Sequence, residues 1–193
     1  MKEASAILLA AGLSTRMGGE DKLLLEYRGA TLLEHAVALL DSLPCGEKII
    51  VSCPGRLGRL ALPKGVRAVA NHNPRLGQSE SLRLGLGAAG AGQQWYLFLS
   101  ADQPRLSARA LEPMFKLASE NRGKIIYPVV NGQPCMPALF ATDFRRQLLA
   151  QTGDTGGRAV RAANAGHCIT FCPASPCDFM DIDSPEDYRR LSK

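Results

Sequence analysis

Short apolar runs alternate with segments of helical spacing along the chain. Apolar runs bounded by turn residues are typical of buried strands, and apolar positions three and four apart are typical of helices. We predict strands over residues 5–9, 48–52, 66–70, 95–100, 125–130 and 137–140. We predict helices over residues 31–40, 79–89, 107–120, 142–150, 156–163 and 184–191.

The order of these elements predicts the fold class. Strands and helices alternate up to about residue 120, which is typical of βαβ units and of a mostly parallel sheet with helices on both faces. The second half is less regular, and we interpret residues 125–183 as a lid-like insertion on the same domain. The expected architecture is a single α/β domain over residues 1–193, three-layered and Rossmann-like. Ligands of such sheets lie beyond the carboxyl ends of the strands.

Length, composition and charge narrow the class of protein. A chain of 193 residues, 46% hydrophobic and 21% charged, can bury one sizeable core and is neither disordered nor fibrous. No apolar run is long enough to span a bilayer, and the N-terminus does not resemble a signal peptide, so we expect a cytoplasmic protein without membrane contact.

The chain is basic, but its charge is spread out. Lys and Arg number 23 against 18 Asp and Glu, for a net charge of +5. The densest basic stretches, 56–67 and 145–161, are interpreted as solvated faces, with phosphate-bearing ligands or polyanions as the alternatives. No compact Lys/Arg run is present to hold nucleic acid, so we expect no nucleic-acid partner. The excess charge suits a small anionic substrate.

The cysteines carry no metal or disulfide signature. None of the six is spaced as C-x-x-C, and no structural zinc pattern with histidine is present. We interpret them as reduced thiols, with zinc binding or a redox role as the alternative. The six positions are Cys45, Cys53, Cys135, Cys168, Cys172 and Cys177.

The loop after the first predicted strand has the composition of an anion-binding loop. It begins Leu-Ala-Ala-Gly at residues 9–12, and such small residues let successive backbone N–H groups approach a phosphate chain. Arg16 can bind phosphate oxygens with its planar guanidinium, and Lys22 adds a point charge. No Walker A sequence follows the glycine. The alternative is a strand-to-helix turn with glycines for geometry alone.

Carboxylates at two places indicate a divalent metal. Asp102 follows the strand 95–100, so its side chain is expected at the ligand-binding edge, where it would suit Mg²⁺. The alternative for Asp102 is a turn or helix cap. Asp181 and Asp183 are two apart on a short extended segment and therefore point to opposite faces, so that only one is expected to reach the same metal. The other would cap the helix that follows.

Three motif-like features are rejected. The G-x-G-x-x-G of residues 85–90 lies near the end of a predicted helix, not between a strand and a helix, so dinucleotide binding is not expected. The serines at 14, 79 and 81 lack a G-x-S-x-G elbow, which argues against a hydrolase triad. His35 on a helical face is interpreted as structural.

Five motifs in fixed order resemble a known family. They are L-A-A-G-L-S-T-R-M-G with a following lysine at 9–22, G-Q-S-E-S-L-R-L-G-L at 77–86, A-D-Q-P at 101–104, G-D-T-G-G-R at 153–158 and D-I-D-S-P-E-D at 181–187. Together they resemble the MobA-like nucleotidyltransferases, and most closely the molybdenum cofactor cytidylyltransferase group. The segment Gln-Pro-Cys-Met-Pro at 133–137 and the charged Glu80 depart from the group's usual pattern.

The resemblance implies a nucleotide-diphospho-sugar transferase type of fold and a set of site residues. Residues 1–120 would bind the nucleotide and residues 121–193 the acceptor. Nucleotide-binding residues would be Leu9, Ala10, Ala11, Gly12, Ser14, Arg16, Lys22, Ser79 and Ser81. Catalytic roles would fall to Arg16, Lys22 and Asp102, and Mg²⁺ would bind Asp102 and Asp183. The acceptor would contact Gly132, Pro134, Asp154 and Arg158.

The implied reaction is transfer of a nucleoside monophosphate from an NTP to the terminal phosphate of molybdopterin, or of its molybdenum-loaded form, with release of pyrophosphate. CTP is favoured because Ala11 stands where guanylyl relatives have glycine. A molybdenum hydroxylase would be a transient partner that receives the product. One alternative is cytidylyl or guanylyl transfer to another phosphorylated small molecule, such as methylerythritol phosphate. Another is a non-catalytic chaperone that delivers cofactor.

Overall fold

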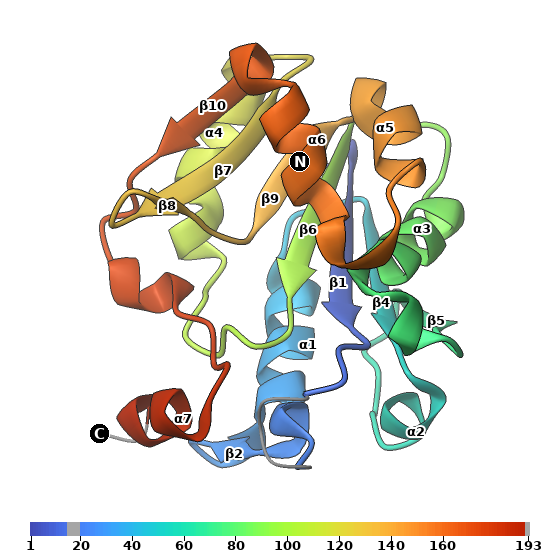
Figure 1. Cartoon of the computed structure of the whole chain (residues 1–193), viewed down its shortest axis with the longest axis vertical. Helices are drawn as coiled ribbons and strands as arrows, with labels where there is room; N and C mark the ends of the chain where they lie inside the picture. The colour runs from blue at the N-terminus through green and yellow to red at the C-terminus, as the bar shows by residue number, and fades with distance from the viewer. Residues whose placement is uncertain (15–19, 192–193) are drawn as a thin grey trace.

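One mixed sheet runs through the centre of the computed structural model, which describes residues 1–14 and 20–191 (Figure 1). The strand order is β10-β7-β9-β6-β1-β4-β5, and β8 pairs with β7. A small separate ribbon is made of β2 (Glu26–Tyr27) and β3 (Ala30–Thr31). The sheet strands are β1 (Ala4–Ala10), β4 (Glu47–Ser52), β5 (Val66–Ala70), β6 (Trp95–Ser100), β7 (Ile125–Val130), β8 (Gln133–Pro134), β9 (Ala138–Ala141) and β10 (Cys168–Phe171).

Helices cover both faces of this sheet. Figure 1 shows α1 and α4 behind the strands and α5 and α6 in front, and α3 packs against α5 and α6 in the front layer. The predicted three-layer α/β architecture is therefore confirmed. The helices are α1 (Leu32–Ser42), α2 (Pro54–Leu57), α3 (Gln78–Ala88), α4 (Glu112–Glu120), α5 (Arg145–Leu149), α6 (Gly156–Ala163) and α7 (Pro185–Leu191).

The strands at the middle of the sheet form the core. β1 lies between β4 and β6 and is parallel to both, with Leu8 opposite Ile50 on one side and Leu99 on the other. All three of these side chains are almost completely buried. A parallel strand covered by helices on both faces has apolar residues at nearly every position, which explains the nearly continuous apolar runs in the sequence.

Close packing explains the rejected G-x-G-x-x-G motif. Gly85 lies inside α3, and a Cβ built there would come within 2.4 Å of the Cγ2 atom of Ile7 in β1. A glycine costs helix stability, so its place in the interior of α3 is explained by the close approach of α3 to the sheet. The first glycine of the motif is therefore explained by packing.

The second half of the chain differs from the predicted lid-like insertion. Strands β7, β9 and β10 continue the same sheet beyond β6, with β9 antiparallel to both β6 and β7 and with β10 parallel to β7. Ile125, Ile126 and Leu139 have no exposed surface. The prediction was wrong because these strands are short and one of them is reversed, so the periodicity does not show that they extend a sheet begun elsewhere.

Two helix boundaries also differ from the predicted ones. The helix expected from Ser107 begins as a single 3-10 turn at Arg109–Leu111 and continues as α4, with Pro113 in its first turn, where its missing N–H is harmless. The helix expected over 142–150 divides into a 3-10 turn and α5. Within residues 1–14 and 20–191, no helix has the length and apolar character needed to cross a membrane.

The cysteines are all free in the structure. Burial raises the pKa of Cys45 to about 11. That thiol is therefore protonated at neutral pH and a poor nucleophile or metal ligand.

Candidate active site

A pocket of about 350 Å³ opens at the carboxyl ends of β1 and β6, the edge that the topology predicts for a ligand. Many of the predicted site residues line it, although they come from positions far apart in the sequence. They are Leu9, Ala11, Gly12, Ser14, Lys22, Ser81, Asp102, Asp154 and Asp183. Arg16, predicted to bind phosphate, lies outside the described residues.

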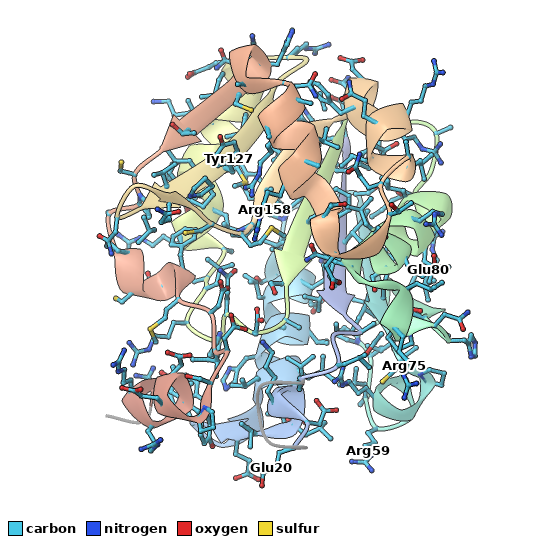
Figure 2. The ribbon with its side chains drawn as sticks, viewed as in Figure 1. Glu20, Arg59, Arg75, Glu80, Tyr127 and Arg158 are labelled. Carbon is cyan, nitrogen blue, oxygen red and sulfur yellow. The ribbon has the colours of Figure 1, made fainter. Side chains whose placement is uncertain are left out.

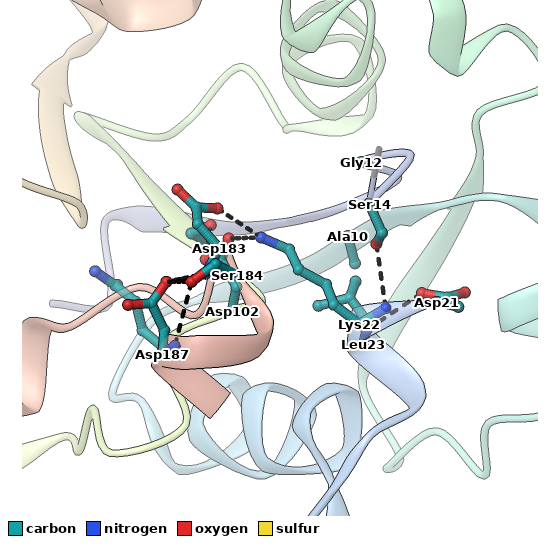
Figure 3. A network of polar contacts seen from close by, with 12 residues as sticks. Ala10, Gly12, Ser14, Asp21, Lys22, Leu23, Asp102, Asp183, Ser184 and Asp187 are labelled. Atoms are coloured by element: carbon teal, nitrogen blue, oxygen red, sulfur yellow. Dashed lines mark hydrogen bonds and ion pairs between the residues drawn. The ribbon is translucent and has the colours of Figure 1, made fainter. Parts of the chain in front are cut away.

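Lys22 stands between two carboxylates at the centre of the pocket wall (Figure 3). Its Nζ donates hydrogen bonds to Oδ2 of Asp102 at 2.7 Å and to Oδ1 of Asp183 at 2.9 Å. Burial alone would lower the pKa of Lys22, but the charges and hydrogen bonds of the two carboxylates outweigh burial and raise its pKa. The side chain is therefore an ammonium ion at neutral pH.

The backbone explains how Asp102 and Asp183 come together. Asp102 emerges two residues after β6, and its carbonyl oxygen accepts a hydrogen bond of 3.0 Å from the N–H of Ile182. That bond fixes the segment before α7 against the end of β6. Ser184 and Asp187 then close the start of α7 with reciprocal hydrogen bonds, since each side chain accepts from the other's N–H. The helix cap is therefore Ser184 with Asp187.

Asp181 and Asp183 lie near the same charged groups but differ in their contacts. Asp183 shares the ammonium of Lys22 with Asp102. Desolvation, together with the charges of Asp102 and Asp183, raises the pKa of Asp181 to about 7. Of the two aspartates, Asp183 is therefore the one that contacts the same cationic atom as Asp102.

The beginning of the first loop contacts Lys22 directly. Ser14, which has a positive φ of 52°, accepts a hydrogen bond of 3.3 Å from the backbone N–H of Lys22 (Figure 3). Gly12 has open space where a Cβ would stand, so a ligand can approach its backbone closely. Ala10 does not line the pocket; it is 1% exposed and its carbonyl oxygen accepts a hydrogen bond from Ser52.

The two serines at the start of α3 have different environments. Ser81 lines the pocket, and its Oγ accepts a hydrogen bond of 2.9 Å from the amide of Asn71. Ser79 is 2% exposed and is not part of the pocket wall. On an α-helix, residues two apart face different directions, so only one of the predicted pair reaches the pocket.

Asp154 links the motif at residues 153–158 to the motif at residues 77–86. Its Oδ1 accepts a hydrogen bond of 3.1 Å from the N–H of Gln78, the first residue of α3. Gly77 has a φ of +89°, and a Cβ there would lie 2.4 Å from the backbone carbon of Gly153. Asp154 therefore caps α3.

The other predicted acceptor residues lie apart from the pocket. Gly132 and Pro134 are exposed on the β7–β8 hairpin. Arg158, which is labelled in Figure 2, is exposed on α6. Arg75 and Gln78 line the pocket but were not predicted. Arg75 could have been found from its place in the loop that follows β5, since that loop leaves the sheet at the same edge.

The carboxylate pair fits a magnesium ion. Asp102 and Asp183 offer hard oxygen donors to the one point that the ammonium of Lys22 occupies. Mg²⁺ ordinarily takes one or two protein carboxylates and completes its shell with water and phosphate oxygens. Throughout the described part of the chain, no group of three or more His, Cys, Asp or Glu side chains could hold a metal. Water and the phosphates of a ligand would therefore supply the remaining donors.

Comparisons with known proteins agree with this geometry. Residues 6–168 match the model of the MobA-like NTP transferase domain. A molybdenum cofactor guanylyltransferase of Pseudomonas syringae is 33% identical over 70% of this chain and 65% of its own length. A probable molybdenum cofactor guanylyltransferase of Mycobacterium avium is 29% identical over 99% of this chain and 96% of its own.

Solved structures share the fold at lower sequence identity. Rv0371c of Mycobacterium tuberculosis has a TM-score of 0.78 and 22% identity over 98% of this chain and 97% of its own. A nucleotidyl transferase from Methanothermobacter has a TM-score of 0.79 and 24% identity over 100% of this chain and 97% of its own. With the family model spanning most of the sequence and the pocket at the expected sheet edge, the chain belongs to the MobA-like NTP transferase family.

Proposed function

We propose that the protein transfers a nucleoside monophosphate from an NTP to the terminal phosphate of molybdopterin, or of its molybdenum-loaded form, with release of pyrophosphate. The observation that carries the proposal is the Lys22 ammonium held between Asp102 and Asp183 in the lining of the pocket. The names of the curated relatives support molybdopterin as the acceptor.

The side chains of the pocket suit a reaction governed by positioning and charge. The acceptor phosphate is already anionic at neutral pH, so the transfer needs no general base and depends on alignment and charge neutralisation. Lys22 supplies a positive charge for the β- and γ-phosphates and for the departing pyrophosphate. Asp102 and Asp183 would hold Mg²⁺, which would neutralise charge at the α-phosphate. The Lys22 ammonium would bind phosphate oxygens in place of the two carboxylates that it contacts in the structure.

The test of the proposal is pyrophosphate release with each NTP, Mg²⁺ and molybdopterin. Release that depends on molybdopterin supports the proposal. Release with methylerythritol phosphate alone would identify a different acceptor. A protein that binds NTP but releases no pyrophosphate with either acceptor would fit the non-catalytic chaperone, and would contradict the proposal.

We predict that CTP is used in preference to GTP. Ala11 lines the pocket, and its methyl group, absent from glycine, should crowd a purine more than a pyrimidine. Steric discrimination of this size is about 1–3 kcal/mol, so the preference should be clear but incomplete. The curated relatives are named guanylyltransferases, so their names favour the opposite base and the choice between CTP and GTP needs a direct measurement. Equimolar CTP and GTP in one assay measure it, and a product containing mostly guanine would refute the preference.

We also predict a role for Arg158 in binding the acceptor. It is exposed on α6, outside the nucleotide pocket, and its guanidinium can bind a phosphate with two parallel hydrogen bonds. Arg158→Ala should raise the KM for the acceptor more than threefold and leave the KM for NTP unchanged. The exposed Arg146 on α5 provides a matched control. A change below threefold, with kcat unaltered, would assign Arg158 to the solvated surface.

A further inference from the structure

A buried arginine behind the pocket contacts both ends of the glycine-rich segment. Arg56 lies in α2, just after β4, and is 6% exposed. The sequence pattern had grouped it with basic residues on a solvated face, and for Arg56 that interpretation is wrong. It is not part of the pocket wall, so any effect on a bound ligand must pass through other residues.

The guanidinium contacts residues that are close in space but separated along the chain. Nη1 donates to the carbonyl oxygen of Ala10 at 2.6 Å, and Nη2 donates to that of Gly12 at 2.8 Å. Nε and Nη2 also donate to the two carboxylate oxygens of Asp21, both at 2.7 Å. Arg56 therefore binds the start of the segment through two carbonyl groups and its end through a paired carboxylate.

Asp21 extends this contact to Lys22. Its Oδ1 also accepts a hydrogen bond of 3.2 Å from the N–H of Leu23, which caps the single 3-10 turn that Lys22 begins. The orientation of that turn sets where the ammonium of Lys22 lies. Arg56 is hydrogen-bonded to Asp21, and Asp21 directly precedes Lys22 in the sequence.

We infer that Arg56 is a positioning residue. It fixes the two ends of the glycine-rich segment, at Ala10 and Gly12 and at Asp21, and through Asp21 it fixes the place of Lys22. The inference rests on the proposed function, because it assumes that this loop binds the NTP. A lysine could keep the charge but not the geometry, since an ammonium cannot form the planar paired contact with a carboxylate while also reaching two carbonyl groups. The requirement is therefore for arginine, and not for a positive charge.

The experiment compares Arg56→Lys and Arg56→Ala with the wild type. Arg59→Ala is the matched control, because Arg59 lies three residues away on the same segment and is exposed (Figure 2). Asp21→Asn tests the same contact from the less buried partner, whose side chain is 30% exposed. For each protein we would measure the melting temperature, the Kd for CTP and for GTP by calorimetry without acceptor, and the KM for molybdopterin.

At temperatures where the variant is fully folded, we expect Arg56→Lys to weaken NTP binding at least tenfold. Its KM for molybdopterin should stay within twofold of the wild-type value. Asp21→Asn should show a loss of similar size. The variant that carries both Arg56→Lys and Asp21→Asn should lose much less binding free energy for NTP than the two single losses added together. The reason is that both changes break the same contact. Arg59→Ala should match the wild type in every measurement.

Three results would overturn the inference. The first is a folded Arg56→Lys that binds NTP within twofold of the wild type. The second is an equal loss of affinity for NTP and for molybdopterin, which a general structural defect would produce. The third is a wild type that binds neither nucleotide, which would end the proposed function as well. If Arg56→Lys does not fold, the NTP affinity of Asp21→Asn tests the inference in its place, and an affinity within twofold of the wild type would overturn it. If the variants lose NTP affinity while the wild type transfers nothing to molybdopterin, only the proposed acceptor is refuted.

Discussion

Asp102→Asn is expected to reduce turnover at least a hundredfold, which corresponds to about 2.7 kcal/mol in the activation free energy. The amide keeps the shape of the side chain but loses the charge with which Asp102 would hold Mg²⁺, an ion that would neutralise phosphate charge. It also loses the ion pair with Lys22. NTP binding measured without metal should be unchanged or slightly tighter, because the Lys22 ammonium then loses one competing carboxylate.

A Mg²⁺ titration of the wild type and the Asn variant checks this prediction. Partial rescue at high Mg²⁺, or near-zero activity throughout, supports a metal ligand. The control is Asp143→Asn, because Asp143 is exposed and does not line the pocket. Wild-type activity of Asp102→Asn at low Mg²⁺, with a small loss of stability, would make Asp102 a turn residue without a part in the reaction.

Lys22→Ala is expected to cost about 2–4 kcal/mol of transition-state stabilisation, the usual effect of removing one preorganised donor. That is a fall of roughly 30- to 1,000-fold in turnover. The structure adds a second expectation. Without the ammonium, Asp102 and Asp183 lose their shared counter-ion. Mg²⁺ should therefore bind the variant more tightly than the wild type in the absence of nucleotide.

Turnover, melting temperature and Mg²⁺ affinity together test the role of Lys22. Lys64→Ala serves as the control, since Lys64 is exposed and lies between secondary-structure elements. Turnover of Lys22→Ala within twofold of the wild type, at an unchanged melting temperature, would exclude a catalytic role. Weaker Mg²⁺ binding by the variant would show instead that Lys22 and the ion do not share one site.

The sequence alone determined the centre of the sheet and the edge at which the pocket lies. β1 and β6 are buried on both faces, so most of their positions are apolar, and such runs can be recognised without a structure. Parallel strands bring their carboxyl ends to one edge, and this places Lys22 and Asp102 in the same region. The family itself could be predicted because five motifs occur in a fixed order.

Which polar residues come into contact is visible in the folded structure alone. Asp183 joins Asp102 because a backbone hydrogen bond from Ile182 ties two segments 80 residues apart. Asp154 caps α3, a helix distant in sequence, and Arg56 is buried against Ala10 and Gly12 although its neighbours in sequence include exposed residues. Hydrophobic periodicity records burial of whole faces. It carries no information about a single polar side chain whose partners are fixed by packing between separate elements.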